Sequence, residues 1–305
     1  MITIRVPAST SNLGAGFDTF GLALELYLDV TVEPCDDPAR DGAIVAVEGE
    51  GAGELPETSD NLVNVAYRLA GVREGVASPP ACFRVRNEIP VSRGLGSSAA
   101  AAVAGFVAFE VMTGVAIPEE RLLAYGVEIE GHSDNVAASA LGGFVTCCTV
   151  DRDVPAVVRT EWPAEIRAVV VVPEVPLSTE EARRILPGAV PRRDAIFDVQ
   201  RAALFNAALG ARRWDLLGEA MRDRLHQPYR EVLLPGLSEA LALEPSGAML
   251  GVAMSGAGSA VLALATGDYE AAGDRIARCF ASHGVASRVL VLAADHAGRR
   301  VLAGA

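Results

Sequence analysis

The residues best suited to chemistry form a glycine- and serine-rich segment at positions 90–100. The segment reads Pro90, Val91, Ser92, Arg93, Gly94, Leu95, Gly96, Ser97, Ser98, Ala99 and Ala100. Its two glycines let the backbone approach a ligand closely, and the small residues that follow predict the start of a helix. Unpaired amides and the dipole of such a helix start attract an anion. We therefore predict a phosphate-binding turn, and the alternative is an ordinary glycine turn that packs tightly before a helix.

Phosphate chemistry at this turn has to proceed without lysine, because all 26 basic residues of the chain are arginine. Enzymes with a pyridoxal-phosphate Schiff base, Walker-type P-loop proteins and eukaryotic-type protein kinases each depend on a lysine, so the composition excludes them. A dinucleotide-binding turn remains an alternative, because Gly94, Gly96 and Ala99 match its Gly-x-Gly-x-x-Ala spacing. Pro90 and Arg93 disfavour it, since they separate the glycines from the preceding strand pattern.

The overall composition limits the partners and the location of the protein. With 39 acidic residues and a net charge of −13 the chain would repel a polyanion, and only 5% of its residues are aromatic, so we expect no nucleic-acid partner. The five cysteines are odd in number and form no Cys-x-x-Cys pair, which indicates a reduced, cytoplasmic protein without structural zinc. We find no signal-peptide pattern and no apolar run long enough to span a bilayer, so we expect no membrane partner.

Two sets of strand and helix patterns must position the chemical residues. The first set has strand patterns at 3–6, 26–32, 43–47, 82–86 and 144–150, and helix patterns at 62–69 and 97–112. The second set has strand patterns at 166–172, 249–254, 260–264 and 287–292, and helix patterns at 178–186, 194–209 and 269–282. The polar, proline-containing stretch 151–155 lies between them, so we predict two mixed α/β domains, 1–155 and 156–305.

The segment at 90–100 also resembles the phosphate-binding signature of the GHMP kinases, the superfamily of galactokinases, mevalonate and phosphomevalonate kinases and homoserine kinases. Two further stretches, 7–18 and 128–143, are similar to homoserine kinases, the second through a His-x-Asp-Asn-Val-Ala run. Shorter matches follow in the family's order at 178–183, 227–230 and 255–258. Ala138 and Ser259 depart from the family, which usually has proline at both positions.

This resemblance implies a fold and an activity. The fold is α+β, with a GHMP kinase ATP-binding domain of small-ribosomal-protein-like βαβ arrangement, followed by a ferredoxin-like α/β domain. The activity is ATP-dependent phosphorylation of the side-chain hydroxyl of L-homoserine to O-phospho-L-homoserine in threonine biosynthesis, carried out by a homodimer. The alternatives are a GHMP kinase acting on an isoprenoid precursor or shikimate, a non-catalytic binding protein on the same fold, and an NAD(P)-binding protein.

The resemblance also assigns residues to the nucleotide and its metal. The backbone of 90–100 would cradle the triphosphate of ATP, with Ser97 contacting a phosphate and Asn61 facing the adenine. Ser98 and Glu128 match the family's ligands for Mg²⁺, an ion that prefers hard oxygen ligands and keeps several waters.

For the amino-acid substrate, the resemblance implies a site with opposite charges. Arg183 and Arg230 match carboxylate-binding arginines, and Asp18 matches the acid that binds the ammonium group. The other substrate-lining positions correspond to Asn12, His132 and Asn135. Asn135, Thr179 and Arg183 are expected at the reacting atoms. Because the amide of Asn135 cannot take a proton at neutral pH, we expect catalysis to rest on positioning and Mg²⁺, with the hydroxyl proton leaving late to a phosphate oxygen.

Overall fold

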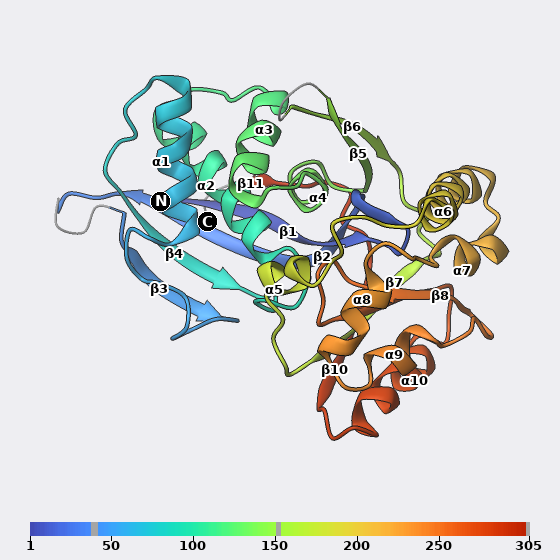
Figure 1. The fold of residues 1–305 in the computed structure, drawn as a ribbon. Coiled ribbons are helices and arrows are strands. Elements are labelled where there is room, and N and C mark those ends of the chain that lie inside the picture. The colour runs from blue at the N-terminus through green and yellow to red at the C-terminus, as the bar shows by residue number, and fades with distance from the viewer. Residues whose placement is uncertain (38–41, 151–153, 303–305) are drawn as a thin grey trace.

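Two β-sheets organise the chain, whose computed structural model describes residues 1–37, 42–150 and 154–302 (Figure 1). In the described residues the larger sheet has the strand order β11–β1–β2–β4–β3, and β5 pairs with β2 and then with β6. Its strands are β1 (Ile2–Asn12), β2 (Gly16–Pro34), β3 (Ile44–Gly49), β4 (Ala81–Asn87), β5 (Phe144–Val150), β6 (Val154–Thr160) and β11 (Arg300–Leu302). The pairs are antiparallel except β3 with β4, which run parallel.

The smaller sheet is antiparallel, in the order β10–β7–β9–β8. Its strands are β7 (Arg167–Pro173), β8 (Met249–Met254), β9 (Val261–Ala265) and β10 (Ser287–Leu292). Alternate side chains of a strand point to opposite faces of the sheet. Val170 and Val172 of β7 accordingly join the core shared with the larger sheet, while Val169 and Val171 join a separate cluster. That cluster lies against α9 (Leu237–Leu241) and α10 (Tyr269–Ala281).

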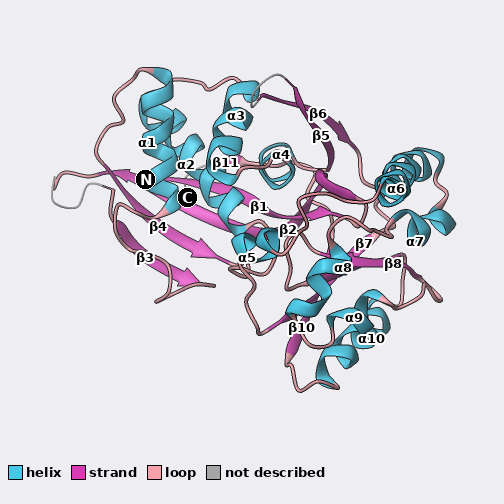
Figure 2. Cartoon of the chain, viewed as in Figure 1, coloured by secondary structure: helices cyan, strands magenta, loops and turns pink. Residues whose placement is uncertain are grey.

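Four helices gather on one side of the larger sheet, as Figure 2 shows. They are α1 (Leu62–Glu74), α2 (Ser97–Thr113), α3 (Glu119–Glu130) and α4 (Asp134–Leu141). The Ala-rich α2 is buried nearly all round, as expected for a helix apolar on every face. Gly105 lets it approach α1 closely, since a Cβ there would lie 2.3 Å from the carbonyl oxygen of Val63.

The remaining helices belong to the second half of the chain. They are α5 (Thr179–Arg184), α6 (Arg192–Ala211), α7 (Leu217–Ala220) and α8 (Gln227–Arg230). The predicted strands and longer helices are confirmed, but β6 and β11 were missed. Pro155 favours a linker in the sequence, but proline is tolerated in β6 because this strand lies at the sheet edge and, among the described strands, pairs with β5 alone. No helix of the described residues is long and apolar enough to cross a membrane.

The two halves of the chain share one core. Phe20 and Phe144 of the larger sheet contact Phe205 of α6, with ring centroids 5.3 and 5.6 Å away, and Trp162 lies 5.8 Å from Phe144. The boundary predicted at residue 155 falls inside β6, and β11 returns from the end of the chain to pair with β1. The change from one sheet to the other therefore lies between β6 and β7.

Candidate active site

The glycine-rich segment forms the wall of a cavity of about 360 Å³ between the two halves of the chain. Gly94 and Gly96 have φ values of +72° and +69°, which favour glycine. A Cβ would lie 1.9 Å from the carbonyl oxygen of Ser255 at position 94, and 2.2 Å from Oγ of Ser9 at position 96. Both glycines are thus required by conformation and by space, and Gly96 opens α2 with its amides at the cavity.

Arg93 fastens this turn to the second half of the chain. Its Nε donates to the carbonyl oxygen of Pro173, the last residue of β7, at 2.9 Å. Its Nη2 donates to the carbonyl oxygen of Glu174, the next residue. Nη1 donates to the carbonyl oxygen of Val91 within the turn itself at 3.0 Å. The side chain of Arg93 therefore acts as a brace for the turn, while its residue still lines the cavity.

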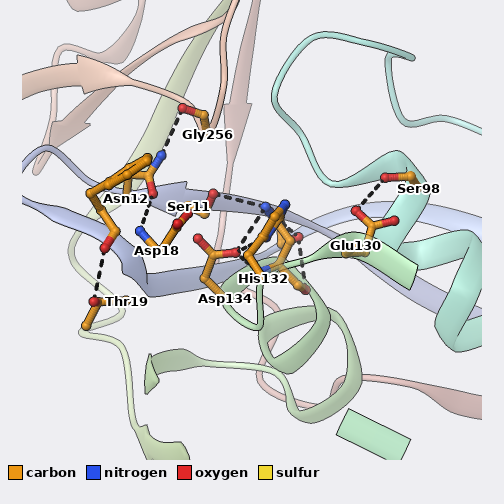
Figure 3. Close-up of polar contacts among 12 residues, drawn as sticks. Ser11, Asn12, Asp18, Thr19, Ser98, Glu130, His132, Asp134 and Gly256 are labelled. Carbon is orange, nitrogen blue, oxygen red and sulfur yellow. Dashed lines mark hydrogen bonds and ion pairs between the residues drawn. The ribbon is translucent and has the colours of Figure 1, made fainter. Parts of the chain in front are cut away.

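A hydroxyl and a carboxylate meet where α2 begins. Oγ of Ser98 donates to Oε2 of Glu130 at 2.8 Å, and both residues line the cavity (Figure 3). Burial raises the pKa of Glu130, although the hydrogen bond from Ser98 acts in the opposite direction. A half-buried carboxylate beside a hydroxyl offers a cation a pair of hard oxygen ligands.

The prediction that Glu128 accompanies Ser98 is wrong. Glu128 is exposed and forms an ion pair with Arg73, with Arg73 Nε 3.0 Å from Oε2, and it does not line the cavity. Residues two apart on an α-helix point about 200° away from each other, so only one of the two glutamates can face the site. The buried stripe of α3 includes Leu122, Leu123 and Gly126. Glu130 lies four residues after Gly126 and eight after Leu122, so it is on the same face of the helix. The spacing of the apolar residues could therefore have indicated Glu130.

At the other end of the cavity Asp18 pairs with Arg183. Nη2 of Arg183 donates to Oδ1 of Asp18 at 2.7 Å, and Nη1 donates to Oδ2 at 3.1 Å. Asn12 holds this acid in place, because its Oδ1 accepts from the backbone N–H of Asp18 at 3.0 Å. Nδ2 of Asn12 in turn donates to the carbonyl oxygen of Gly256 at 2.9 Å (Figure 3).

Arg230 lies beside this pair, 1% exposed, with its guanidinium 5.3 Å from the ring centroid of Phe17. The guanidinium of Arg183 lies 5.7 Å from the same ring. Two guanidinium groups and one carboxylate therefore surround one end of the cavity.

Between the two ends lies a network from the start of α4. Nδ1 of His132 is 2.6 Å from Oδ1 of Asp134. Burial alone would lower the pKa of His132, but the hydrogen bond and charge of Asp134 outweigh it and the pKa is raised. Asn135 is buried, accepts from Oγ of Ser9 at 3.0 Å and donates to Oγ of Ser11 at 3.0 Å.

The structure brings most of the predicted site residues to this one cavity. Its lining includes Asn12, Asp18, Asn61, Pro90, Val91, Ser92, Arg93, Gly94, Leu95, Gly96, Ser97, Ser98, His132, Asn135, Thr179, Arg183 and Arg230. Asn61 also caps α1, accepting from the backbone N–H of Val63 at 3.1 Å. Ala99 and Ala100 are buried in the core behind the cavity instead. The cavity lining also includes Ser11, Phe17, Glu130 and Asp134, which sequence reasoning missed. Of these four, Glu130 has a spacing pattern that could have revealed it.

Two family models and many curated relatives match the chain. The model of the GHMP kinases N terminal domain matches residues 61–143, and that of the GHMP kinases C terminal matches residues 205–286. The chain is 40% identical over 299 residues to a homoserine kinase of Persephonella marina, covering 98% of this chain and 97% of that one. It is 39% identical over 302 residues to a homoserine kinase of Aquifex aeolicus, covering 99% of each.

Solved structures of GHMP kinases have a similar fold. The crystal structure of a homoserine kinase from Cytophaga hutchinsonii superposes with a TM-score of 0.86 at 28% identity, covering 99% of this chain and 97% of that one. A galactokinase of Lactococcus lactis shares the fold, with a TM-score of 0.69 at 15% identity, covering 99% of this chain and 95% of that one. With its two domain matches and relatives similar over nearly the full length, the chain belongs to the homoserine kinases of the GHMP kinase superfamily.

Proposed function

We propose that the protein transfers the γ-phosphoryl group of ATP to the side-chain hydroxyl of L-homoserine, giving O-phospho-L-homoserine and ADP as a step of threonine biosynthesis. One observation carries the proposal. A single cavity has a glycine turn with Ser98 and Glu130 at one end, and Asp18 with Arg183 and Arg230 at the other. The first end suits a triphosphate, and the second matches the ammonium and carboxylate groups of an amino acid.

Substrate binding would change the ion pairs at the end of the cavity that holds Asp18 and Arg183. Asp18 and Arg183 neutralise each other across two hydrogen bonds in the structure. A zwitterionic amino acid offers an ammonium group to Asp18 and a carboxylate to Arg183 and Arg230, so it can replace this pair with two new ones. Its side-chain hydroxyl then extends from the charged end toward Asn135 and the glycine turn, which line the same cavity.

The residues at the glycine turn fit Mg²⁺. Among the described residues no group of three or more histidine, cysteine and acidic side chains could hold a metal ion. Mg²⁺ needs fewer protein ligands, because it keeps several waters and is bound through one or two carboxylates plus substrate phosphates. We assign its protein ligands to Oγ of Ser98 and the carboxylate of Glu130, which already lie 2.8 Å apart. Bound there, the ion would neutralise charge that develops on the phosphates.

Main-chain groups supply the rest of the phosphate site. The amides at the start of α2 lack partners within the helix, and α2 is long enough for its dipole to favour a phosphate. Because these donors belong to a rigid turn braced by Arg93, they need little reorganisation as charge moves onto the leaving phosphate.

No side chain that we place at the reacting atoms acts as a general base in this mechanism. The amide of Asn135 is held by Ser9 and Ser11, and it cannot accept a proton at neutral pH. Its role is to orient the hydroxyl, together with Thr179, while the proton passes late to a phosphate oxygen. A much faster turnover of Asn135→Asp would contradict this view, because it would show that basicity limits the reaction.

An acceptor panel tests the function directly. ADP release is measured with L-homoserine, mevalonate, shikimate or no acceptor, each with Mg²⁺, and we expect turnover with homoserine alone. Mevalonate and shikimate have a carboxylate but no ammonium group, so the pairing of Asp18 with two arginines discriminates against them. Release without an acceptor, or none with homoserine, overturns the proposal.

A further inference from the structure

The environment of the Arg230 guanidinium decides which of its N–H groups can reach a substrate. Nε donates to the carbonyl oxygen of Ala182 at 3.0 Å. Nη1 lies 3.3 Å from the carbonyl oxygen of Gly256 and 3.2 Å from Nδ1 of His226. No acceptor for Nη2 is found within the described part of the chain. Since Arg230 lines the cavity, Nη2 keeps its hydrogens for a ligand there.

His226 contributes an acceptor only in one tautomer, and its surroundings select that tautomer. Nε2 lies 2.9 Å from the carbonyl oxygen of Gly14, which can only accept, so Nε2 has to carry the proton. Nδ1 is then unprotonated and accepts from Arg230. His226 is fully buried, and burial lowers its pKa more than the charge of Asp223 raises it, so the imidazole stays neutral at pH 7.

Three further contacts fix the place of the imidazole. Its ring stacks on Phe17, with the centroids 4.9 Å apart and the planes at 22°. Oδ2 of Asp223 accepts from the backbone N–H groups of His226 and Gln227, at 3.1 and 2.6 Å. Phe17 also lies beneath the guanidinium groups of Arg183 and Arg230, so one ring supports the imidazole and both arginines.

We propose that His226 is a positioning residue for substrate recognition: by accepting from Nη1 of Arg230, it turns Nη2 of that arginine toward the carboxylate of the amino-acid substrate. The proposal rests on the function proposed above, because it takes Arg230 as a carboxylate ligand. His226 itself does not line the cavity, and of the residues that do, Arg230 is the one whose side chain it hydrogen-bonds.

Two substitutions separate the functions of the two ring nitrogens. His226→Asn places an amide oxygen where Nδ1 lies and can still accept from Arg230, but it does not reach Gly14. His226→Gln places its amide near Nε2 and can still donate to Gly14, but it leaves Nη1 of Arg230 without this acceptor. A buried charged donor that loses its acceptor is costly. We therefore expect His226→Gln to raise the KM for homoserine about tenfold, with kcat and the KM for ATP within about twofold.

The conservative variant and a double mutant complete the test. His226→Asn should keep a KM for homoserine close to that of the unsubstituted protein, and adding His226→Gln to Arg230→Met should cause no further rise. Equal KM increases in the Asn and Gln variants, or an undiminished effect of His226→Gln beside Arg230→Met, overturn the proposal. If His226→Gln does not fold, a raised KM in His226→Asn overturns it alone.

The same variants distinguish a failure of the proposed function from a failure of the positioning role alone. If Arg230→Met leaves the KM for homoserine unchanged, the proposed role of Arg230 in the function fails. If Arg230→Met raises that KM and His226→Gln does not, only the positioning role of His226 fails. Thermal unfolding of each variant, followed by circular dichroism, shows whether a change in KM accompanies a loss of the fold.

Discussion

At the scale of single residues, α3 offers a matched pair of carboxylates that differ only in the face they occupy. Glu130 is bonded to Ser98 inside the cavity, and Glu128 is paired with Arg73 outside it. We expect Glu130→Gln to lower kcat/KM by about 100-fold or more, because it removes the charge that we propose to hold Mg²⁺ beside the phosphates. Steady-state rates over a Mg²⁺ titration provide the measurement.

Glu128→Gln is the control for this substitution. It removes an exposed ion pair, which typically contributes less than about 1 kcal/mol, so activity should stay within about twofold. A large loss of activity in Glu128→Gln, or an unchanged Mg²⁺ dependence in Glu130→Gln, would return the metal site to Glu128.

Asp18 allows a second prediction about a single residue. Asp18→Asn keeps the size of the side chain but removes the charge that would bind the ammonium group, and it also leaves Arg183 without its ionic partner. We expect the KM for homoserine to rise about ten- to 100-fold, while the KM for ATP changes little. A comparable rise in both KM values would show that the substitution disturbs the whole cavity, and not only amino-acid binding.

At the scale of elements, α2 has left-handed glycines at its two ends, and they differ in their surroundings. Gly94, before the helix, and Gly114, after it, have φ values of +72° and +73°. A Cβ at position 94 would collide with the backbone of Ser255, whereas position 114 has nothing within 4 Å. An alanine costs about 1–2 kcal/mol of backbone strain at either place.

We expect Gly94→Ala to lower the free energy of unfolding by more than this strain alone, because the turn must move away from Ser255. The same movement should raise the KM for ATP at least tenfold. Gly114→Ala should lower the free energy of unfolding only by the strain and should leave the kinetics unchanged. Urea unfolding and steady-state kinetics of the two variants test this. Equal losses of stability, with unchanged ATP binding in both, would mean that close packing of the turn has no part in phosphate binding.

The loop before α8 is tied to α6 by a pair of buried acids. Asp198 accepts from the backbone N–H of Arg224 at 3.0 Å, and burial together with the neighbouring carboxyl of Asp223 raises the pKa of Asp198 to about 8. Since the folded protein then holds a proton that the unfolded chain releases near pH 3.8, stability falls as pH rises from about 4 to about 8.

Asp198→Asn removes this titration but keeps an amide that can donate to Asp223. We expect its free energy of unfolding to rise relative to that of the unsubstituted protein between pH 5.5 and pH 8.5. Urea denaturation provides the measurement, with Asp18→Asn as a charge-matched control. A parallel pH dependence in the two proteins would show that Asp198 is ionised in the fold.

At the scale of the whole molecule, the cavity lies between two halves that share a core. Phe20 and Phe144 from the larger sheet pack with Phe205, and β7 contributes Val170 and Val172 to the same cluster. We therefore expect a single cooperative unfolding transition. Homoserine with Mg²⁺ and a non-hydrolysable ATP analogue should stabilise the whole protein by about 2.7 kcal/mol for a ligand at 100 times its Kd.

Scanning calorimetry provides this measurement. A single transition that shifts upward with the ligands is expected. Two transitions, of which the ligands move only one, would show that the halves unfold independently and that the shared core does not couple them.

Local sequence patterns are sufficient to predict the glycine turn, most of the longer elements and the charged residues at the other end of the cavity. These features depend on short segments. The conformation of Gly94 and Gly96 follows from their own lack of a side chain, and a strand or helix pattern follows from local spacing. Short motifs therefore predict which residues form the two ends of the cavity.

Which side chains meet depends on tertiary packing. Which glutamate of α3 faces Ser98 depends on the packing of the helix, and motif matching named Glu128, which pairs with Arg73 outside the cavity. Arg183 and Asp18 lie 165 positions apart, and His226 and Gly14 lie 212 apart. The return of β11 to β1 likewise depends on a pairing between the chain's two ends. Such contacts follow from the packing of whole elements, which no local pattern records.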